Sequence, residues 1–304
     1  MARKYATCSC CGRKFLVVDM VGTTSAKRGG NVEYMCSDCA TRNRNYHATN
    51  NAVLGTDKVN EVYCGIEFES SFSDEYARNV MFEYKFIPTH DGSLVSDNSG
   101  QRYGYWDRNS CEYVSGLMKG LNRASKFALS CDRLMNDGHL KVNSSCGTHF
   151  HVSIDSMKDE YGDKKYMGYI RRFYNSLFVP LCEEMKANPE ATQAVFGRYF
   201  TGYAQAIDWE TTQKEHEDRY YFINCMADTN IEFRLNKFVS GKQYQALMKM
   251  EVEMTKAIVA NFCEHFMDTE WDKRRYEKRT AYRKHKADVT AQKLVKIFRK
   301  YANI

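Results

Sequence analysis

Three short segments share the pattern that most constrains how this chain can fold: two ionisable residues one residue apart, set among apolar neighbours. The pairs are Glu67-x-Glu69, His149-x-His151 and Glu232-x-Arg234. Residues i and i+2 of a β-strand project from the same face of a sheet, and the residue between them projects from the other face. The pattern therefore predicts a sheet with one apolar core face and one face that carries carboxylates, imidazoles and a guanidinium.

Each pair also has an ordinary interpretation when it is taken alone. A Glu-x-Glu strand usually has a solvated face, a His-x-His pair is often exposed or structural, and a Glu-x-Arg pair is usually a weak surface ion pair. Burying all three sets of charges without compensation is costly. Their joint occurrence favours a site for metal ions and polyphosphate, in which carboxylate, Mg²⁺ and phosphate neutralise one another.

The rest of the chain predicts an α+β fold, with an antiparallel sheet and helices packed on one face. Strand-like patterns cover 62–69, 112–115, 148–154, 219–225 and 230–237, and helical patterns cover 118–136, 164–185 and 242–267. We expect three parts: a head and linker at 1–50, a catalytic body at 58–268 and a basic helical tail at 269–304.

Five motifs occur in a fixed order along the body. They are Gly65-Ile66-Glu67-Phe68-Glu69, Asp91-Gly92-Ser93-Leu94, Glu112-x-Val114-Ser115, Cys146-Gly147-Thr148-His149-Phe150-His151-Val152-Ser153 and Asn230-Ile231-Glu232-Phe233-Arg234. This series resembles the amidoligase family, a branch of the carboxylate–amine ligase superfamily that includes glutamine synthetase and glutamate–cysteine ligase. The resemblance covers residues 65–234 and excludes the head and the tail. It implies a glutamine-synthetase-like core that uses ATP and Mg²⁺ to form an amide or peptide bond through an acyl phosphate.

The resemblance also implies roles for individual residues. The metal ligands for two or more Mg²⁺ ions would be Glu67, Glu69, Glu112, His149 and Glu232. His151 would contact phosphate or nucleotide, and Arg234 would face the transferred phosphoryl group; with Glu67, these two are the predicted catalytic residues. Glutamine synthetase has one more metal-binding glutamate soon after the position of Glu112, and this sequence has no good counterpart. The number of ions therefore stays open.

Four further features have weaker claims. Arg198 has a planar fork that suits a carboxylate or phosphate, including that of a nucleotide, but a helix-surface arginine is an equal alternative. Asn224 either faces the site or makes a cross-strand hydrogen bond. Asp91-Gly92-Ser93 either positions a substrate or forms a turn. Cys146, just before the His-x-His strand, is expected to be a buried thiol.

The head carries a separate metal-binding pattern. Cys8-x-x-Cys11 and Cys36-x-x-Cys39 flank residues 12–35, which is the spacing of a zinc ribbon with four thiolate ligands for one Zn²⁺. Cys10 is an alternative ligand. The other cysteines have no ligand spacing and are expected to be core thiols, namely Cys64, Cys111, Cys131, Cys182, Cys225 and Cys263.

Composition and charge limit the kinds of partner that the chain is expected to have. The net charge is +6, and it is concentrated in the basic tail, which either contacts nucleic acid or an acidic partner or forms a solvated helix. No apolar run approaches the about 20 residues of a membrane helix, and the first residues lack an apolar signal core, so we expect a cytoplasmic protein without a membrane partner.

Three functional hypotheses remain. The first is an active ligase that joins a carboxylate to the amine of an amino acid, peptide or protein. The second is a non-enzymatic protein on an inactive ligase scaffold, whose zinc head and basic tail bind nucleic acid or protein. The third is a metal-dependent phosphohydrolase with the same polar face.

Overall fold

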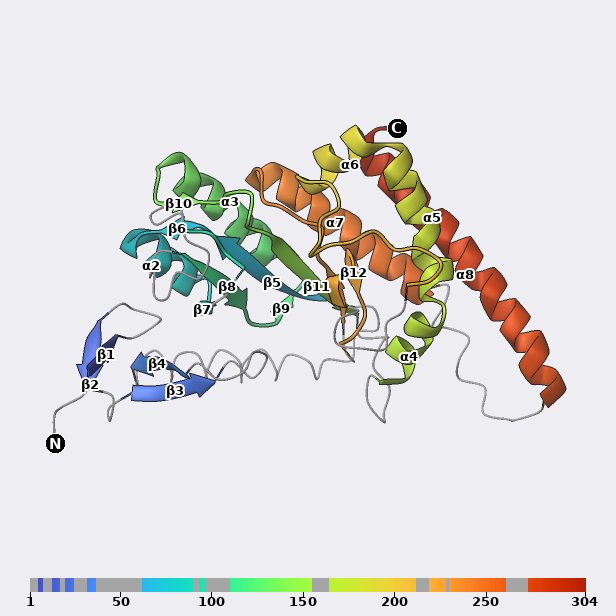
Figure 1. The fold of residues 1–304 in the computed structure, drawn as a ribbon, viewed down its shortest axis with the longest axis horizontal. Coiled ribbons are helices and arrows are strands. Elements are labelled where there is room, and N and C mark those ends of the chain that lie inside the picture. Colours follow the sequence, from blue (N-terminus) through green and yellow to red (C-terminus); the bar gives the residue numbers. More distant parts are fainter. Residues whose placement is uncertain are drawn as a thin grey trace. The chain divides into compact units, whose positions relative to one another are not determined.

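A computed structural model describes residues 5–7, 13–16, 20–24, 32–36, 62–89, 93–96, 110–154, 164–211, 219–227, 230–260 and 273–304. These residues form short strands and longer helices (Figure 1). The strands are β1 Tyr5–Thr7, β2 Lys14–Leu16, β3 Met20–Thr24, β4 Val32–Cys36, β5 Val62–Ser70, β6 Phe72–Ser73, β7 Phe86–Thr89, β8 Cys111–Ser115, β9 Met118–Lys119, β10 Leu140–Lys141, β11 Thr148–Ile154, β12 Ile223–Asn224 and β13 Ile231–Phe233. The helices are α2 Glu75–Glu83, α3 Asn122–Asn136, α4 Lys164–Arg172, α5 Tyr174–Ala187, α6 Pro189–Phe196, α7 Gly241–Ile258 and α8 Lys273–Ala302.

The chain divides into two compact units. One contains residues 1–56 and 65–148, and the other contains residues 57–64 and 149–304. The division falls within β5, after Cys64, and within β11, after Thr148. This division into compact units uses other boundaries than the predicted parts at 1–50, 58–268 and 269–304. The assignment of those three parts stays a prediction.

The largest sheet among the described strands has the order β12-β13-β11-β5-β8-β7, with β9 pairing with β5 beside this path. Every pairing in it with a determined register is antiparallel, as in β11 with β13 and in β5 with β8. The predicted mixture of helices with an antiparallel sheet is therefore confirmed. A glutamine-synthetase-like arrangement, with helices on one face, stays a prediction.

The apolar residues of the three patterned strands occupy the core, as the period of two predicts. Phe68, Phe150 and Phe233 have exposed fractions of at most 1%. Their neighbours in the same parity, including Ile66 and Val152, are equally buried. A slip of one residue in register would bring these side chains to the polar face, so the alternation fixes the register.

Helix boundaries differ in places from the sequence expectation. The predicted helix 164–185 is two helices, α4 and α5, separated by Phe173. The apolar repeat of 3.6 residues continues across this break, so periodicity alone did not reveal it. The predicted helix 118–136 begins only at Asn122, after the short strand β9. The predicted strands 219–225 and 230–237 are shorter, and only β12 and β13 remain of them.

The second unit contains a group of packed helices. The long helix α8 packs along α5 and α7 (Figure 1). Leu294 and Phe298 of α8 are fully buried, whereas Arg299 and Lys300 form exposed ion pairs with Glu184 of α5 and Glu253 of α7. The C-terminal half of the predicted basic tail is therefore an amphipathic helix with a buried face. Within the described part of the chain, no helix combines the length and apolar character needed to cross a membrane.

Gly197 closes helix α6 and sets the position of the segment after β13. Its φ of +77° is a left-handed conformation that favours glycine. A Cβ atom here would lie 2.5 Å from the carbonyl oxygen of Lys237. The absence of a side chain at residue 197 thus allows the end of α6 to approach the backbone that follows Arg234.

Candidate metal centre

Glu232 of β13 has contacts with Asn224, Arg234 and His149 on the polar face of the second unit. Its Oε2 accepts a hydrogen bond of 2.5 Å from Nδ2 of Asn224, which lies directly opposite on β12. Its Oε1 pairs with Nη1 of Arg234 on its own strand. Glu232 and Arg234 are 7% and 9% exposed. The carboxylate is therefore fixed by an amide and a guanidinium in a setting that water reaches poorly, which strengthens each interaction.

The two histidines of β11 lean in the same direction toward β13. His151 lies opposite Glu232 in the register, yet its Nδ1 is 3.1 Å from Oδ1 of Asn230. Nδ1 of His149 is 3.5 Å from Oε1 of Glu232. Each imidazole is thus oriented by an oxygen of the neighbouring strand. Such contacts set the tautomer and the ring orientation of a metal-binding histidine.

A row of carboxylates lies on β5 and β8 in the first unit. Glu69 pairs directly with Glu112 in the antiparallel register. The backbone N–H of Gly147 donates to Oε2 of Glu69 over 2.5 Å, and Oγ1 of Thr89 donates to Oε2 of Glu112 over 2.8 Å. Two like charges directly opposite on a sheet repel one another. Each carboxylate is oriented by a neutral hydrogen-bond donor. A neutral donor does not cancel the charge of an ionised carboxylate.

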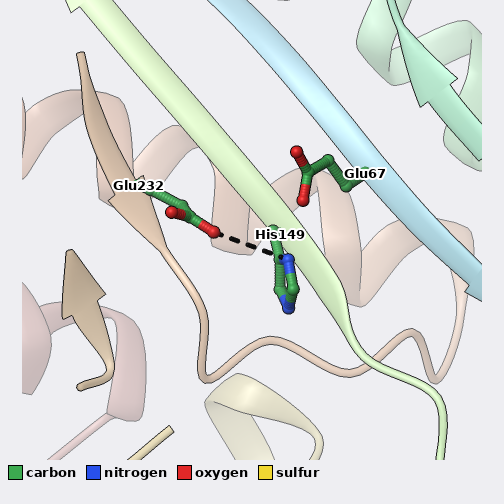
Figure 2. Close-up of side chains that lie close together, drawn as sticks. All are labelled: Glu67, His149 and Glu232. Carbon is green, nitrogen blue, oxygen red and sulfur yellow. Dashed lines mark ion pairs between the residues drawn. The ribbon is translucent and has the colours of Figure 1, made fainter. Parts of the chain in front are cut away.

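Five predicted metal ligands fall into two groups with ligand atoms within 4.8 Å of one another. One group is Glu67, His149 and Glu232, which Figure 2 shows with both carboxylates close to the imidazole. The other is Glu69, Glu112 and His149. Carboxylate oxygens suit hard cations such as Mg²⁺ and Mn²⁺, and an imidazole nitrogen suits transition-metal ions, so these side chains fit a divalent cation.

The charge of these groups favours a cation. The two groups contain four glutamates, each negative when ionised, and Arg234 forms an ion pair with Glu232. Glu69, Glu112 and Glu232 are each less than 10% exposed, and Glu67 is half-buried. Repulsion among buried carboxylates is costly unless a cation or a proton neutralises them.

Arg198 has a more specific position than the sequence indicated. Its Nε donates to the carbonyl oxygen of Leu235 over 2.9 Å, and its Nη2 donates to that of Arg234 over 2.6 Å. These bonds indicate that Arg198 holds the backbone behind Arg234. Its predicted contact with a nucleotide stays a prediction. Asn224 makes the cross-strand hydrogen bond that was one of its two alternatives.

Among the described cysteines of the body, all except Cys111 are buried thiols. Cys64, Cys131, Cys146, Cys182 and Cys225 are buried, and Cys111 is partly exposed. Burial raises the pKa of the Cys146 thiol to about 11, so the nucleophilic thiolate is scarce at neutral pH. Cys263, Asp91 and Gly92 lie outside the described residues.

The head is described only in part. β1 pairs with β2, so that Thr7 and Lys14 close the connection that contains Cys8 and Cys11 in the sequence. β3 pairs with β4, whose last residue is Cys36. Cys8, Cys10, Cys11 and Cys39 and the side chain of Cys36 lie outside the described part, and the zinc ribbon stays a prediction.

Several residues that orient the ligands had no assigned role in the sequence analysis. Thr89 and Gly147 bond the carboxylates of Glu112 and Glu69, and Asn230 bonds His151. A signal existed for Asn230, because it has the same strand parity as Glu232 and Arg234. Thr89 gave no local signal, since only the pairing of β7 with β8 brings it opposite Glu112.

Comparison with models of protein families and with curated proteins returns no match for this chain.

Proposed function

We propose that this chain is an ATP- and Mg²⁺-dependent carboxylate–amine ligase with a glutamine-synthetase-like core, as its resemblance to the amidoligase family implies. The observation that carries the proposal is the pair of carboxylate–histidine groups that share His149, next to the buried Arg234–Glu232 pair. Two neighbouring cation positions beside a fixed guanidinium suit a polyphosphate whose terminal phosphoryl group is transferred.

The chemistry has two steps. An oxygen of the substrate carboxylate attacks the γ-phosphorus of ATP, the bond to the β,γ-bridging oxygen breaks, and ADP leaves. The amine nitrogen then attacks the acyl carbon, the bond between that carbon and the phosphate oxygen breaks, and phosphate leaves with the electron pair. The amine gives up one proton to solvent.

The chain's own residues would act by positioning and by charge. Glu67, Glu69, Glu112, His149 and Glu232 would hold Mg²⁺, which when bound neutralises the charge on the phosphate oxygens. Arg234 would place a fixed positive charge at the transferred group, and His151 would contact the phosphates or nucleotide. The low exposure of Glu232 and Arg234 supports a site with little water, which an acyl phosphate requires because water hydrolyses it.

The proposal is tested first with ATP and a general amine. Mg·ATP should raise the melting temperature of the wild-type chain, and Mg²⁺-free ATP should raise it less. Incubation with Mg·ATP, mixed amino acids and peptides, and hydroxylamine should then yield acyl hydroxamate and one phosphate per product. Steady ATP hydrolysis that needs no amine would instead indicate a phosphohydrolase. A chain that ignores Mg·ATP but binds nucleic acid with strong salt dependence would support the non-enzymatic alternative.

We also propose that the head binds one Zn²⁺ through Cys8, Cys11, Cys36 and Cys39. The pairing of β1 with β2 and the position of Cys36 at the end of β4 support this proposal, because Cys8 and Cys11 follow β1 in the sequence and Cys39 follows β4. Purified protein should release one zinc ion per chain on denaturation. Cys11→Ser should lose most of it, and the neighbouring substitution Cys10→Ser should retain it. Equal zinc loss in both variants would contradict the assigned ligand set.

A further inference from the structure

The segment after β13, residues 234–237, is fixed to the rest of the second unit at each residue. The N–H of Arg234 donates to the carbonyl of Phe222 over 2.7 Å, and the N–H of Lys237 donates to that of Phe196 over 2.8 Å. Arg198 bonds the two carbonyls between them, as described above. The remaining member, Asn236, is held through its side chain.

Asn236 and Glu251 of α7 form a buried polar pair. Both residues have an exposed fraction of 0%, and Nδ2 of Asn236 donates to Oε2 of Glu251 over 3.2 Å. The remaining polar atom of each group, Oδ1 of Asn236 and Oε1 of Glu251, is also buried and has no hydrogen-bond partner among the described residues. A buried oxygen without a donor destabilises the folded state, and a buried charge destabilises it more. A single proton shared between Oδ1 of Asn236 and Oε1 of Glu251 would remove both costs.

No described cation compensates a charge on Glu251. The helices α6 and α8 pack against α7. Their fully buried side chains carry no charge: they are Thr192 and Phe196 of α6 and Ala287, Thr290, Ala291, Leu294 and Phe298 of α8. Lys300 of α8 pairs with Glu253 at the surface. Burial raises the pKa of Glu251 well above its ordinary value, and the hydrogen bond from Asn236 offsets only part of this.

We propose that Glu251 is a neutral carboxylic acid that donates its O–H to Oδ1 of Asn236, and that this acid–amide pair positions Arg234. A protonated carboxyl has one donor and one free acceptor, which match the acceptor and the donor of an amide. One proton thereby satisfies both unpaired oxygens. Because Asn236 follows Arg234 by two residues, the pair anchors the backbone that carries the guanidinium.

The protonated acid gives the fold a defined pH dependence. The folded-state pKa of Glu251 is raised above the unfolded value of about 4.3, so its contribution is complete below that pH. The contribution is lost as the pH rises through the folded-state pKa. Over this interval, the folding equilibrium constant should fall by about tenfold per pH unit on account of Glu251 alone.

Glu251→Gln tests the protonation directly, because the glutamine amide donates and accepts in the same places at every pH. We expect the melting temperature of the wild type to fall more steeply than that of Glu251→Gln between pH 5 and pH 8.5. At pH 8 the variant should be at least as stable as the wild type. The infrared spectrum of the wild type at pH 7 should contain a protonated carboxyl C=O band that the variant lacks.

The positioning role is tested by Mn²⁺ affinity at pH 7, with the folded Glu251→Gln variant compared with Glu251→Leu. The glutamine variant should retain the wild-type affinity, and the leucine variant should lose about 10–100-fold, the range of an outer contact of a metal site. If Glu251→Leu does not fold, Asn236→Ala serves in its place.

A glutamine variant that is less stable than wild type at pH 8, or a wild type without the infrared band, overturns the neutral acid. A leucine variant with unchanged affinity, or a wild type that binds no Mn²⁺, overturns the positioning role. Neither the infrared nor the pH measurement depends on ligase activity.

Discussion

Arg234→Met should lower the free energy of unfolding by about 3–5 kcal/mol in Mg²⁺-free buffer, the range for breaking a buried ion pair by removing one partner. The substitution keeps most of the side-chain volume and removes the guanidinium that bonds Glu232. It leaves a carboxylate that is 7% exposed in the same group as Glu67. The negative charge of Glu232 is then repelled by the carboxylate of Glu67, and little solvent is available to stabilise it. Urea denaturation of the two proteins at pH 7 measures the difference.

Arg299→Met is the matched control for this experiment. Arg299 also forms an arginine–carboxylate pair, with two hydrogen bonds of 2.8 Å to Glu184, but its side chain is 53% exposed. Water and salt screen that pair, so we expect only a small change in the urea midpoint. Mn²⁺ should restore more stability to Arg234→Met than to Arg299→Met, because a cation can replace the lost positive charge. Equal destabilisation in the two variants would show that Arg234 does not compensate a buried charge.

Strand parity explains why much of the sheet and the site could be predicted from the sequence. The alternation in β5, β11 and β13 is a local property of each strand, and it determines which side chains share a face. The burial of Phe68, Phe150 and Phe233 follows from that alternation alone. Parity therefore predicted that the polar residues of each strand share a face without any knowledge of which strand lies beside which, whereas Glu112 and the metal-ligand roles came from the family resemblance.

The contacts that orient the site could not be predicted in this way, because they depend on pairing between distant segments. Thr89 reaches Glu112 through the register of β7 with β8, and Arg198 reaches Leu235 across a long sequence separation. The break between α4 and α5 was also invisible, since Phe173 continues the apolar repeat. Tertiary packing decides such features, and local propensity is only a weak guide to them.

The sequence of α7 itself contains a signal for the buried position of Glu251. The apolar side of α7 includes Tyr244, Met248 and Ile258, at helical spacing. Glu251 and Thr255 fall on the same side, whereas Glu253 falls on the exposed side and pairs with Lys300. A charged residue on the apolar stripe of a helix is expected to be neutral or paired, so this position marks a buried acid.

Glu232→Gln should abolish the stabilisation by Mg·ATP, and this is the largest functional effect that we expect. Glu232 contributes to one carboxylate–histidine group and pairs with Arg234, so it links the proposed cation position to the proposed phosphoryl contact. The glutamine keeps the shape but offers a weaker neutral oxygen to a cation, and its amide nitrogen faces one of the two donors, Asn224 or Arg234. Ligand at 100 times its dissociation constant stabilises a folded chain by about 2.7 kcal/mol. We therefore expect a rise of several degrees in the melting temperature of the wild type and almost none in the variant.

Glu253→Gln is the matched control, because it makes the same chemical change on an exposed glutamate whose partner is Lys300. It should keep the full Mg·ATP shift. The comparison must use variants that are folded without ligand, as judged by circular dichroism and a cooperative melting transition. If Glu232→Gln keeps the wild-type shift, nucleotide binds elsewhere and the proposed metal centre is wrong. If both variants lose the shift, the effect reflects the net charge of the chain and not a site at Glu232.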